Sequence, residues 1–323
     1  MKPFALFAAL FATALLALRA PAAAQAQDFP LTIPHKFGET VILAPPARVA
    51  SVDFTGADDL LALGVQPVTI RDWYGDFPDG LWPWAAPLLT TTPPLLRGEL
   101  NYEQIAAQKP DVIIALWSGI GAADYERLSR IAPVVAVPAG VGDFSLPWDE
   151  RAMIAGRAIG RETLASKKVA AIHAQMAAIA AAHPDWQGKT ASVAWFLGGG
   201  LGAYSGQDVR VQLLASLGFH LPPRLAARVK GDGFSVPLSE EAIGLLEADV
   251  LVWTMADGDM SAPDRVVTRP FLITAKEGRE VLSGKLLTGA MSHASLLSLP
   301  WALERLEPAL NEAMAGKGPV LVE

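Results

Sequence analysis

Aromatic side chains give this sequence its clearest chemical signal. Nine tryptophans accompany only four tyrosines, and several tryptophans fall where a predicted strand ends or a loop begins: Trp73, Trp117, Trp195 and Trp253. The carboxyl ends of strands line the ligand cleft of an open α/β sheet, and aromatic faces pack well against organic ligands. The pattern predicts a cleft for a bulky organic molecule, although any single tryptophan can equally belong to the core.

One arginine has the setting of a ligand contact. Arg97 precedes Gly98 in a predicted loop, just before a helix expected to begin near Asn101. A guanidinium in such a loop can hold an acidic ligand group with two parallel hydrogen bonds. The alternative is an ordinary salt bridge on the surface, and the sequence leaves both open.

The sequence lacks the residues and motifs that thiol, metal, serine-nucleophile and dinucleotide chemistry require. The sequence has no cysteine, which excludes a thiol nucleophile, a thiolate metal site and an acylated cysteine. The histidines are too scattered to predict a metal site: His35, His173, His183, His220 and His293. No G-x-S-x-G elbow occurs, and the glycine-rich run 198–202 fits no G-x-G-x-x-G register. We therefore expect no cofactor and no enzyme, with an exported hydrolase built on a spatial triad as the alternative.

The first 26 residues predict a secretory signal peptide. Met1-Lys2 gives a positive start, residues 4–18 are apolar apart from Thr13, and residues 22–26 offer Ala-x-Ala cleavage sites. Arg19 between the apolar run and these sites keeps a membrane anchor as the alternative. Removing Lys2 and Arg19 from the 26 basic residues leaves 24 against 33 acidic ones, which argues against nucleic acid as a partner. We expect a soluble periplasmic protein.

Residues 101–115 and 239–253 form an internal repeat. Four residues of the first copy recur 138 positions later: Glu103, Ile105, Asp111 and Val112. In each copy a polar residue, Asn101 or Ser239, is expected to cap a short helix. The unbroken apolar run that follows is typical of a buried parallel strand. The repeat predicts two similar α/β lobes, although short helix–strand units can also share composition by chance.

Strand and helix signals alternate on both sides of a long helical stretch. Strands are expected near 48–52, 67–70, 111–116, 134–137, 191–197, 249–254 and 280–282, with helices at about 56–63 and 300–314. Residues 148–182 predict one or two long helices that end at His183-Pro184. The expected parts are a signal peptide (1–26), an N-terminal α/β lobe (27–147), a connecting helix (148–184) and a C-terminal α/β lobe (185–323). A stiff helical connector limits closure of the lobes around a shallow cleft.

Several of these segments resemble one family of transport proteins. The chain is similar to periplasmic substrate-binding proteins of ABC importers in Arg97, the Asn101-x-Glu103 spacing, the run 109–113 (KPDVI), the long connector and the run 298–303 (SLPWAL). The resemblance covers about residues 46–312 and is closest to the helical-backbone class that binds ferric siderophores, ferric hydroxamates among them. It implies a monomer that holds a ferric siderophore between its lobes, delivers it to an inner-membrane ABC permease dimer and catalyses no reaction.

The resemblance also implies roles for single residues. The permease-docking glutamates of the family fall on Glu103 and Glu241, and its siderophore-contacting arginine falls on Arg97. A tryptophan of the family falls on Leu81, so neighbouring Trp82 can replace it only if the loop shifts by one residue. Together with the aromatic pattern and a candidate loop histidine, the expected ligand-binding residues are Trp73, Tyr74, Arg97, Trp117, Phe196, Tyr204, Trp253 and His293. Haem or cobalamin is the alternative ligand, and the sequence does not identify the siderophore.

Overall fold

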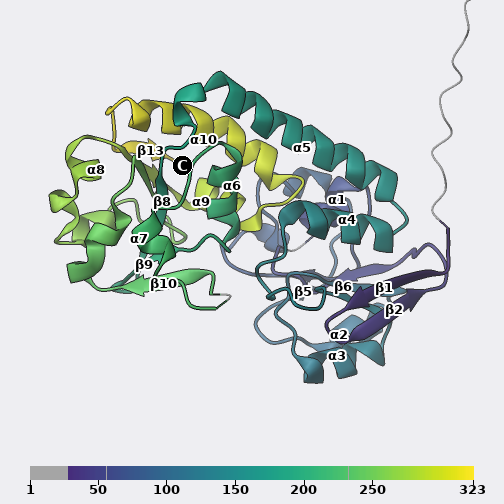
Figure 1. Cartoon of the computed structure of the whole chain (residues 1–323). Coiled ribbons are helices and arrows are strands. Elements are labelled where there is room, and N and C mark those ends of the chain that lie inside the picture. Colours follow the sequence, from purple (N-terminus) through teal and green to yellow (C-terminus); the bar gives the residue numbers. More distant parts are fainter. Residues whose placement is uncertain (1–27, 56, 232) are drawn as a thin grey trace, which may run out of the picture.

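Two groups of strands, with helices between and above them, make up the computed structural model (Figure 1). It describes residues 28–323 apart from 56 and 232, so the predicted signal peptide lies outside the described residues. The described chain begins with an antiparallel hairpin of β1 (Leu31–His35) and β2 (Gly38–Ile42). The chain then enters the first of two larger sheets.

The first sheet is parallel, as its unbroken apolar runs predict. Strand β6 (Val112–Ala115) lies between β3 (Val49–Ser51) and β7 (Val134–Ala136), and every residue of the three strands is buried. A parallel bridge between Ala50 and Thr69 connects β3 to the parallel pair β4 (Ile70–Arg71) and β5 (Leu95–Leu96). The strand expected at 67–70 is therefore shorter than predicted and begins only at Ile70. The helical segments of this part are α1 (Asp58–Ala62), η1 (Pro78–Gly80), η2 (Ala86–Leu88), α2 (Tyr102–Ala107) and α3 (Ala122–Ser129).

The second sheet has the strand order β10-β9-β8-β11-β12-β13. Strands β8 (Ala191–Leu197), β11 (Val250–Thr254), β12 (Glu280–Ser283) and β13 (Val320–Val322) run parallel, while β9 (Gly200–Tyr204) and β10 (Ser235–Leu238) are antiparallel additions. Gly198 and Gly199 turn the chain from β8 into β9 with φ of 58° and 80°, which only glycine adopts readily. The accompanying helical segments are α6 (Val209–Ser216), α7 (Pro223–Ala226), η4 (Glu240–Leu246), η5 (Ala262–Arg265), η6 (Arg269–Phe271), α8 (Ile273–Lys276), α9 (Lys285–His293) and α10 (Ser298–Met314).

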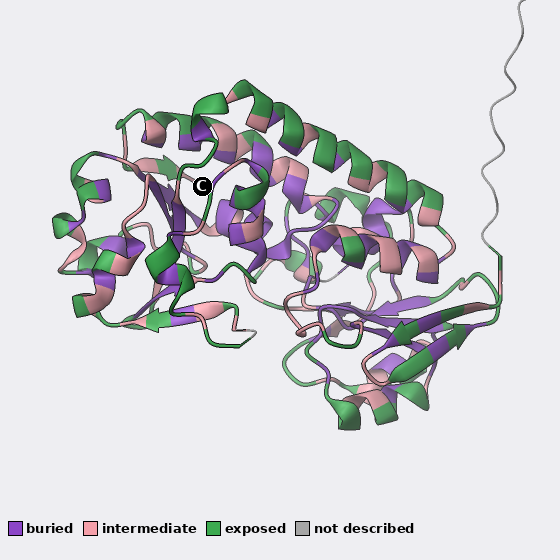
Figure 2. Cartoon of the chain, viewed as in Figure 1, coloured by how far each residue is buried: buried purple, intermediate pink, exposed green. Residues whose placement is uncertain are grey.

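The stretch between the sheets forms two helices. These are α4 (Trp148–Ala158) and α5 (Glu162–Ala182), followed by η3 (Pro184–Trp186). A Cβ on Gly156 would lie 2.4 Å from the Cβ of Ala165, so glycine is what lets α4 and α5 approach so closely. Helix α5 runs along the top of the molecule over both sheets, and its outward surface is exposed while its underside is buried (Figures 1 and 2).

A single apolar core links the two sheets. Its buried side chains come from β3 and β6 in the first sheet, from α4, α5 and α10, and from β8 and β11 in the second. Helix α5 contributes Ala165, Ile172, Met176 and Ile179 to it. Because interiors pack densely and resist shear, this shared core is expected to restrict movement of one sheet relative to the other.

The internal repeat has a structural counterpart at its two aspartates. One carboxylate oxygen of Asp111 accepts hydrogen bonds from the backbone nitrogens of Ala47 and Arg48, both at 2.8 Å, just before β3. Asp249 accepts in the same way from the backbone nitrogen of Thr190, at 2.7 Å, just before β8. Each aspartate thus joins the start of its own strand, β6 or β11, to the strand that pairs with it in parallel.

The two copies differ in their helices. Asn101 caps α2 as predicted, with its side chain accepting from the backbone nitrogen of Gln104 at 3.0 Å. Ser239 stands at the predicted cap position, but its backbone carbonyl, rather than its side chain, accepts from the Ala242 backbone nitrogen. The segment that follows Ser239 is accordingly the tighter 3-10 helix η4.

Candidate functional site

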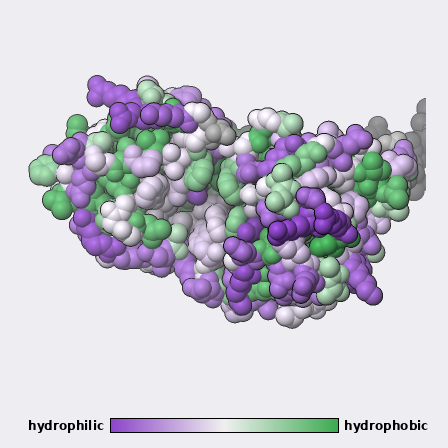
Figure 3. All heavy atoms as spheres, turned by 90° about the horizontal axis from the view of Figure 1, so that it is seen from below, coloured by the Kyte–Doolittle hydropathy of each residue, from purple (hydrophilic) through white to green (hydrophobic). Residues whose placement is uncertain are grey.

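A cleft of about 500 Å³ lies between the two sheets. One wall is the loop after β4 (73–76), and the rest comes from the β8–β9 hairpin, the start of α6, the loop after β11 and the helix α9. Figure 3 shows this surface from below, with a hollow between its two halves. The lining therefore gathers strand ends and helix starts from both sheets, where α/β proteins commonly bind ligands.

The wall from the first lobe is an aromatic cluster fixed to α9. Trp73 is 38% exposed and meets Tyr74 edge to face, with ring centroids 4.7 Å apart. Behind them Trp82 and Trp84 stack at 5.1 Å. Trp82 fits against α9 because residue 289 is glycine: a Cβ on Gly289 would lie 2.2 Å from the Trp82 ring. Packing across the lobes thus holds this wall in place before any ligand arrives.

A buried arginine faces the aromatic wall across the cleft. Arg210 lies at the start of α6, where the carboxylate of Asp208 caps the helix by accepting from the Arg210 backbone nitrogen at 2.9 Å. The guanidinium carbon lies 3.8 Å from the centroid of the Tyr204 ring, and Nε lies 3.5 Å from the Asp208 carboxylate. Arg210 is only 8% exposed, yet among the described residues its Nε and Nη1 have no hydrogen-bond partner. Buried donors of this kind are costly to leave unpaired, so they indicate a ligand with oxygen acceptors.

The neighbours of Arg210 keep it charged. Burial lowers the pKa of Arg210, but Asp208, Tyr204 and Tyr74 together raise the pKa above its usual value. Burial raises the pKa of Tyr74 to about 12, and a hydrogen bond with Ser292 offsets only part of that rise. The cleft therefore presents a permanent cation and neutral hydroxyl groups beside a rigid aromatic wall.

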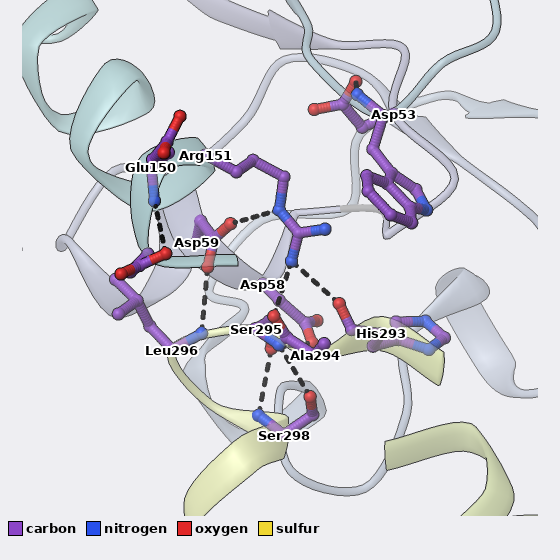
Figure 4. A network of polar contacts seen from close by, with 12 residues as sticks. Asp53, Asp58, Asp59, Glu150, Arg151, His293, Ala294, Ser295, Leu296 and Ser298 are labelled. Carbon is purple, nitrogen blue, oxygen red and sulfur yellow. Dashed lines mark hydrogen bonds and ion pairs between the residues drawn. The ribbon is translucent and has the colours of Figure 1, made fainter. Parts of the chain in front are cut away.

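A buried polar network joins the two lobes behind the cleft (Figure 4). Asp59 of α1 accepts from Nε of Arg151 at 3.2 Å and from the backbone nitrogen of Leu296 at 2.9 Å. Nη2 of Arg151 donates to the carbonyl oxygens of His293 and Ala294, at 2.8 and 2.7 Å. Helices α1 and α4 are thereby connected to the turn between α9 and α10, next to the part of α9 that lines the cleft.

Asp58 is expected to make the stability of this network depend on pH. It accepts hydrogen bonds from the Ser295 hydroxyl and the Trp84 indole, both at 2.7 Å, while burial raises its pKa to about 7. Because the folded pKa lies above the unfolded value, the contribution of Asp58 to stability is greatest at low pH and is lost as pH rises through about 7. We expect Asp58→Asn to remove at least about 1 kcal/mol of the difference in unfolding free energy between about pH 6 and about pH 8.

Urea unfolding of wild type and variant at both pH values measures this effect. Burial also raises the pKa of Asp53, to about 6. Wild type and variant should therefore both keep a smaller pH dependence of the unfolding free energy at the lower end of this pH range. Glu312→Gln, an exposed change on α10, is the control and should leave the wild-type dependence intact. An Asp58→Asn variant with the wild-type pH dependence would contradict the prediction.

Three of the predicted ligand residues lie together in the cleft. Trp73 and Tyr74 form the first-lobe wall, and Tyr204 lies on the opposite side under the guanidinium of Arg210. Contact of these three with a ligand stays a prediction. The other five predicted ligand residues do not line the cleft.

Two tryptophans predicted at the cleft belong to the core instead. Trp253 is fully buried, and its indole nitrogen donates to the Glu280 carboxylate at 2.7 Å. Trp117 is 4% exposed and has the Arg151 guanidinium 5.0 Å from its ring centroid. A strand end places a side chain near the edge of a sheet, but the packing of helices against that edge decides whether it stays exposed.

The predictions for three other residues also need correction. His293 is 3% exposed, its Nδ1 lies 2.9 Å from the carbonyl oxygen of Gly289, and burial lowers its pKa to about 3, so it is a neutral packing residue. Phe196 lies outside the cleft lining and meets Arg265, whose guanidinium is 5.7 Å from the ring centroid. The Arg97 side chain is 70% exposed and pairs with Asp72 at 3.1 Å, which is the surface salt bridge of the alternative interpretation.

The sequence interpretation missed Arg210 and the α9 residues Lys285, Thr288 and Ser292. For Arg210 a usable signal exists, because Asp208 is a good helix cap that closely follows the strand end at Tyr204. A basic side chain two residues after such a cap lies beside the carboxyl ends of the strands. The α9 residues carry no comparable signal.

The comparisons with known proteins agree with this geometry. Residues 49–281 match the family described as periplasmic binding protein. The chain belongs to the periplasmic binding protein family. Among solved structures, this binding protein is similar to a periplasmic solute binding protein from Mycobacterium smegmatis, with a TM-score of 0.76 and 32% identity over 88% of this chain and 98% of the other.

Two further relatives of this binding protein carry the name of a ligand in their descriptions. PiaA from Streptococcus pneumoniae, solved in complex with ferrichrome, has a TM-score of 0.74 and 26% identity over 88% of this chain and 99% of PiaA. The Bacillus subtilis protein named "Probable siderophore-binding lipoprotein YfiY" is 28% identical over 232 residues, which are 69% of this chain and 68% of that protein. The family resemblance expected from the sequence is confirmed.

Proposed function

We propose that this binding protein captures a ferric siderophore in the cleft between its lobes and delivers it to an ABC permease, without catalysing a reaction. The observation that carries the proposal is the buried guanidinium of Arg210, which lines the cleft opposite an aromatic wall and whose Nε and Nη1 make no hydrogen bond among the described residues. Ferric complexes of siderophores offer oxygen atoms for such donors and organic surface for such a wall. The siderophores named for PiaA and YfiY support the same ligand class.

Iron is expected to arrive already wrapped by its chelator. Among the described residues, no group of three or more His, Cys, Asp or Glu side chains could hold a metal ion. The Arg210 guanidinium in the cleft lining instead suits a ligand with its own oxygen shell, while the hydroxyl groups of Thr288 and Ser292 donate to the carbonyl oxygens of Ser283 and Thr288. The hydrolase alternative would require a reactive histidine or serine in the cleft, whereas His293 is buried and the Ser292 hydroxyl donates to the carbonyl oxygen of Thr288.

Delivery is assigned to the two glutamates of the repeat. Glu103 lies on α2 and Glu241 on η4, both exposed and one on each lobe. A pair of acidic groups held at a fixed spacing by the shared core can set the register of a monomer on a basic, dimeric permease. Each contact is modest alone, about 0 to 1 kcal/mol. The proposed location is the periplasm after removal of residues 1–26, and among the described residues no helix is long and apolar enough to cross a membrane.

Tryptophan fluorescence tests the proposed ligand class. Because Trp73 lies exposed in the cleft, a ferric siderophore should quench intrinsic fluorescence with sub-micromolar affinity. Ferric ion alone and the metal-free chelator should bind far more weakly, since neither presents a complete oxygen shell to Arg210. Titration with ferric hydroxamate, catecholate and carboxylate complexes, haem and cobalamin makes the comparison. Tightest binding of haem or cobalamin, or equal binding of bare iron, would refute the proposal.

A further inference from the structure

The cleft is lined by charged groups of two kinds, one buried and one mostly exposed. Arg210 is buried among Tyr204, Tyr74 and its partner Asp208. The lining also holds Lys285, at the start of α9, and the carboxylates of Asp76 and Asp257. The second group is referred to below as the acidic edge, defined by Asp76, Asp257 and Lys285.

The contacts of Lys285 show how the acidic edge is built. A Cβ on Gly258 would lie 3.5 Å from the Lys285 Cβ, so the base of the side chain lies against the loop that holds Asp257. The Lys285 ammonium then reaches to 5.1 Å from the centroid of the Phe77 ring, in the loop that holds Asp76. Lys285 therefore extends between the two chain segments that supply the carboxylates, one from each lobe.

The carboxylates of the acidic edge form no ion pair with a cation of the described protein. Asp76 and Asp257 are both exposed, and Asp257 accepts a hydrogen bond from the backbone nitrogen of Asp259 at 3.1 Å. In the part of the chain that the structure describes, neither of them nor Lys285 forms an ion pair. Two carboxylates against one ammonium leave the acidic edge with an excess negative charge, while the buried guanidinium keeps its own positive charge elsewhere in the cleft.

We propose that the preferred cargo is a ferric siderophore with a positively charged arm. Resting on the proposed function, this inference places the chelate oxygens at the Arg210 guanidinium and a protonated amine at Asp76 and Asp257. The two charged groups of the protein then select for a ligand with oxygen acceptors at its chelate and a positive charge on its arm. A neutral arm would leave the carboxylates unmatched, and a strongly anionic complex would be repelled by them.

A matched pair of ligands isolates the charge of the arm. Ferrioxamine B carries a free protonated amine, and its N-acetyl derivative has the same ferric trihydroxamate centre with a neutral arm. Calorimetric titration at low salt is expected to show about fivefold tighter binding of ferrioxamine B, as for two partly exposed ion pairs. This preference should shrink as salt is added, because screening weakens exposed charge pairs.

Variants connect the preference to the acidic edge. In Asp76→Asn/Asp257→Asn the preference for ferrioxamine B should disappear and turn slightly toward the acetylated complex, because Lys285 is then the only charged group of the acidic edge. Asp79→Asn is the matched control: it removes an exposed carboxylate of the same loop outside the cleft and should keep the preference. Lys285→Gln should enlarge the preference because it removes the opposing ammonium.

The outcomes separate this inference from the proposed function. Equal affinity of wild type for the two ferrioxamine complexes, or tighter binding of the anionic complex ferric enterobactin than of ferrioxamine B, would overturn the charged arm while leaving siderophore capture in place. A preference that persists in Asp76→Asn/Asp257→Asn would overturn the role of the acidic edge. Failure of all these ferric complexes to bind would overturn the proposed function and, with it, the inference.

Discussion

Replacing Arg210 with methionine is expected to weaken binding of a ferric siderophore by about tenfold to a hundredfold. This loss corresponds to a charge-assisted hydrogen bond, which contributes roughly 1.5 to 3 kcal/mol. The expectation rests on the buried guanidinium that lines the cleft and whose Nε and Nη1 make no hydrogen bond within the described protein. Methionine preserves much of the apolar stem of Arg210 while removing every donor, including the guanidinium that lies over the Tyr204 ring. Isothermal calorimetry with a ferric siderophore bound by the wild type measures the loss.

The buried partner of Arg210 has to be considered in the same experiment. Asp208 is 4% exposed, so removing Arg210 alone leaves a buried carboxylate without its cation, and the single variant can unfold for that reason. The double variant Asp208→Asn/Arg210→Met removes both charges and should fold while still failing to bind tightly. Arg97→Ala is the control and should change the affinity less than about twofold, as expected for an exposed salt bridge. Wild-type affinity in the folded double variant would contradict the role of Arg210.

Replacing both Glu103 and Glu241 is expected to abolish uptake while leaving ligand affinity nearly unchanged. Both side chains are exposed, and neither lines the cleft, so the change to alanine removes the proposed docking charge from each lobe without touching the ligand site. Lysine at both positions should be worse than alanine, because it places like charges against a basic permease surface. Uptake of a radiolabelled ferric siderophore, in cells that lack the native protein and express the variant, measures delivery.

A matched control distinguishes docking from a general loss of negative charge. Glu39 and Glu312 are also exposed, on β2 and α10, and alanine at both removes the same number of charges. That control should transport like wild type. Normal uptake by the Glu103/Glu241 variant would remove these residues from the delivery step, and loss of ligand affinity would place them in the binding site.

The sequence predicted the repeat and the parallel strands well because their signals are local. Asp111 and Asp249 follow a helix and precede an unbroken apolar run, and each accepts backbone hydrogen bonds from the strand that pairs beside it. Continuous apolar strands covered on both faces leave little choice of arrangement. The helical stretch of 148–182 was equally clear, since its few glycines mark the break between α4 and α5.

The cleft was harder to predict because exposure at a strand end depends on contacts distant in the sequence. Trp253 lies near the end of β11, and Trp73 lies in the loop after β4. Trp253 is nevertheless buried and donates a hydrogen bond to Glu280, while Trp73 remains exposed. His293 looked like a loop residue, but it ends α9 and lies under the aromatic cluster. The sequence marked Arg210 only through Asp208, the cap residue of its helix, and many other helix starts in a sequence show the same pattern.

Locating the iron atom tests the central claim most directly. A crystal of the protein with its ferric siderophore, measured at the iron absorption edge, gives the position of iron from anomalous scattering. The account predicts a single site in the cleft between Trp73 and Tyr204, with siderophore oxygens as the only iron ligands and the Arg210 guanidinium bonded to the chelate. Iron bound directly by protein side chains, or located outside this cleft, would contradict it.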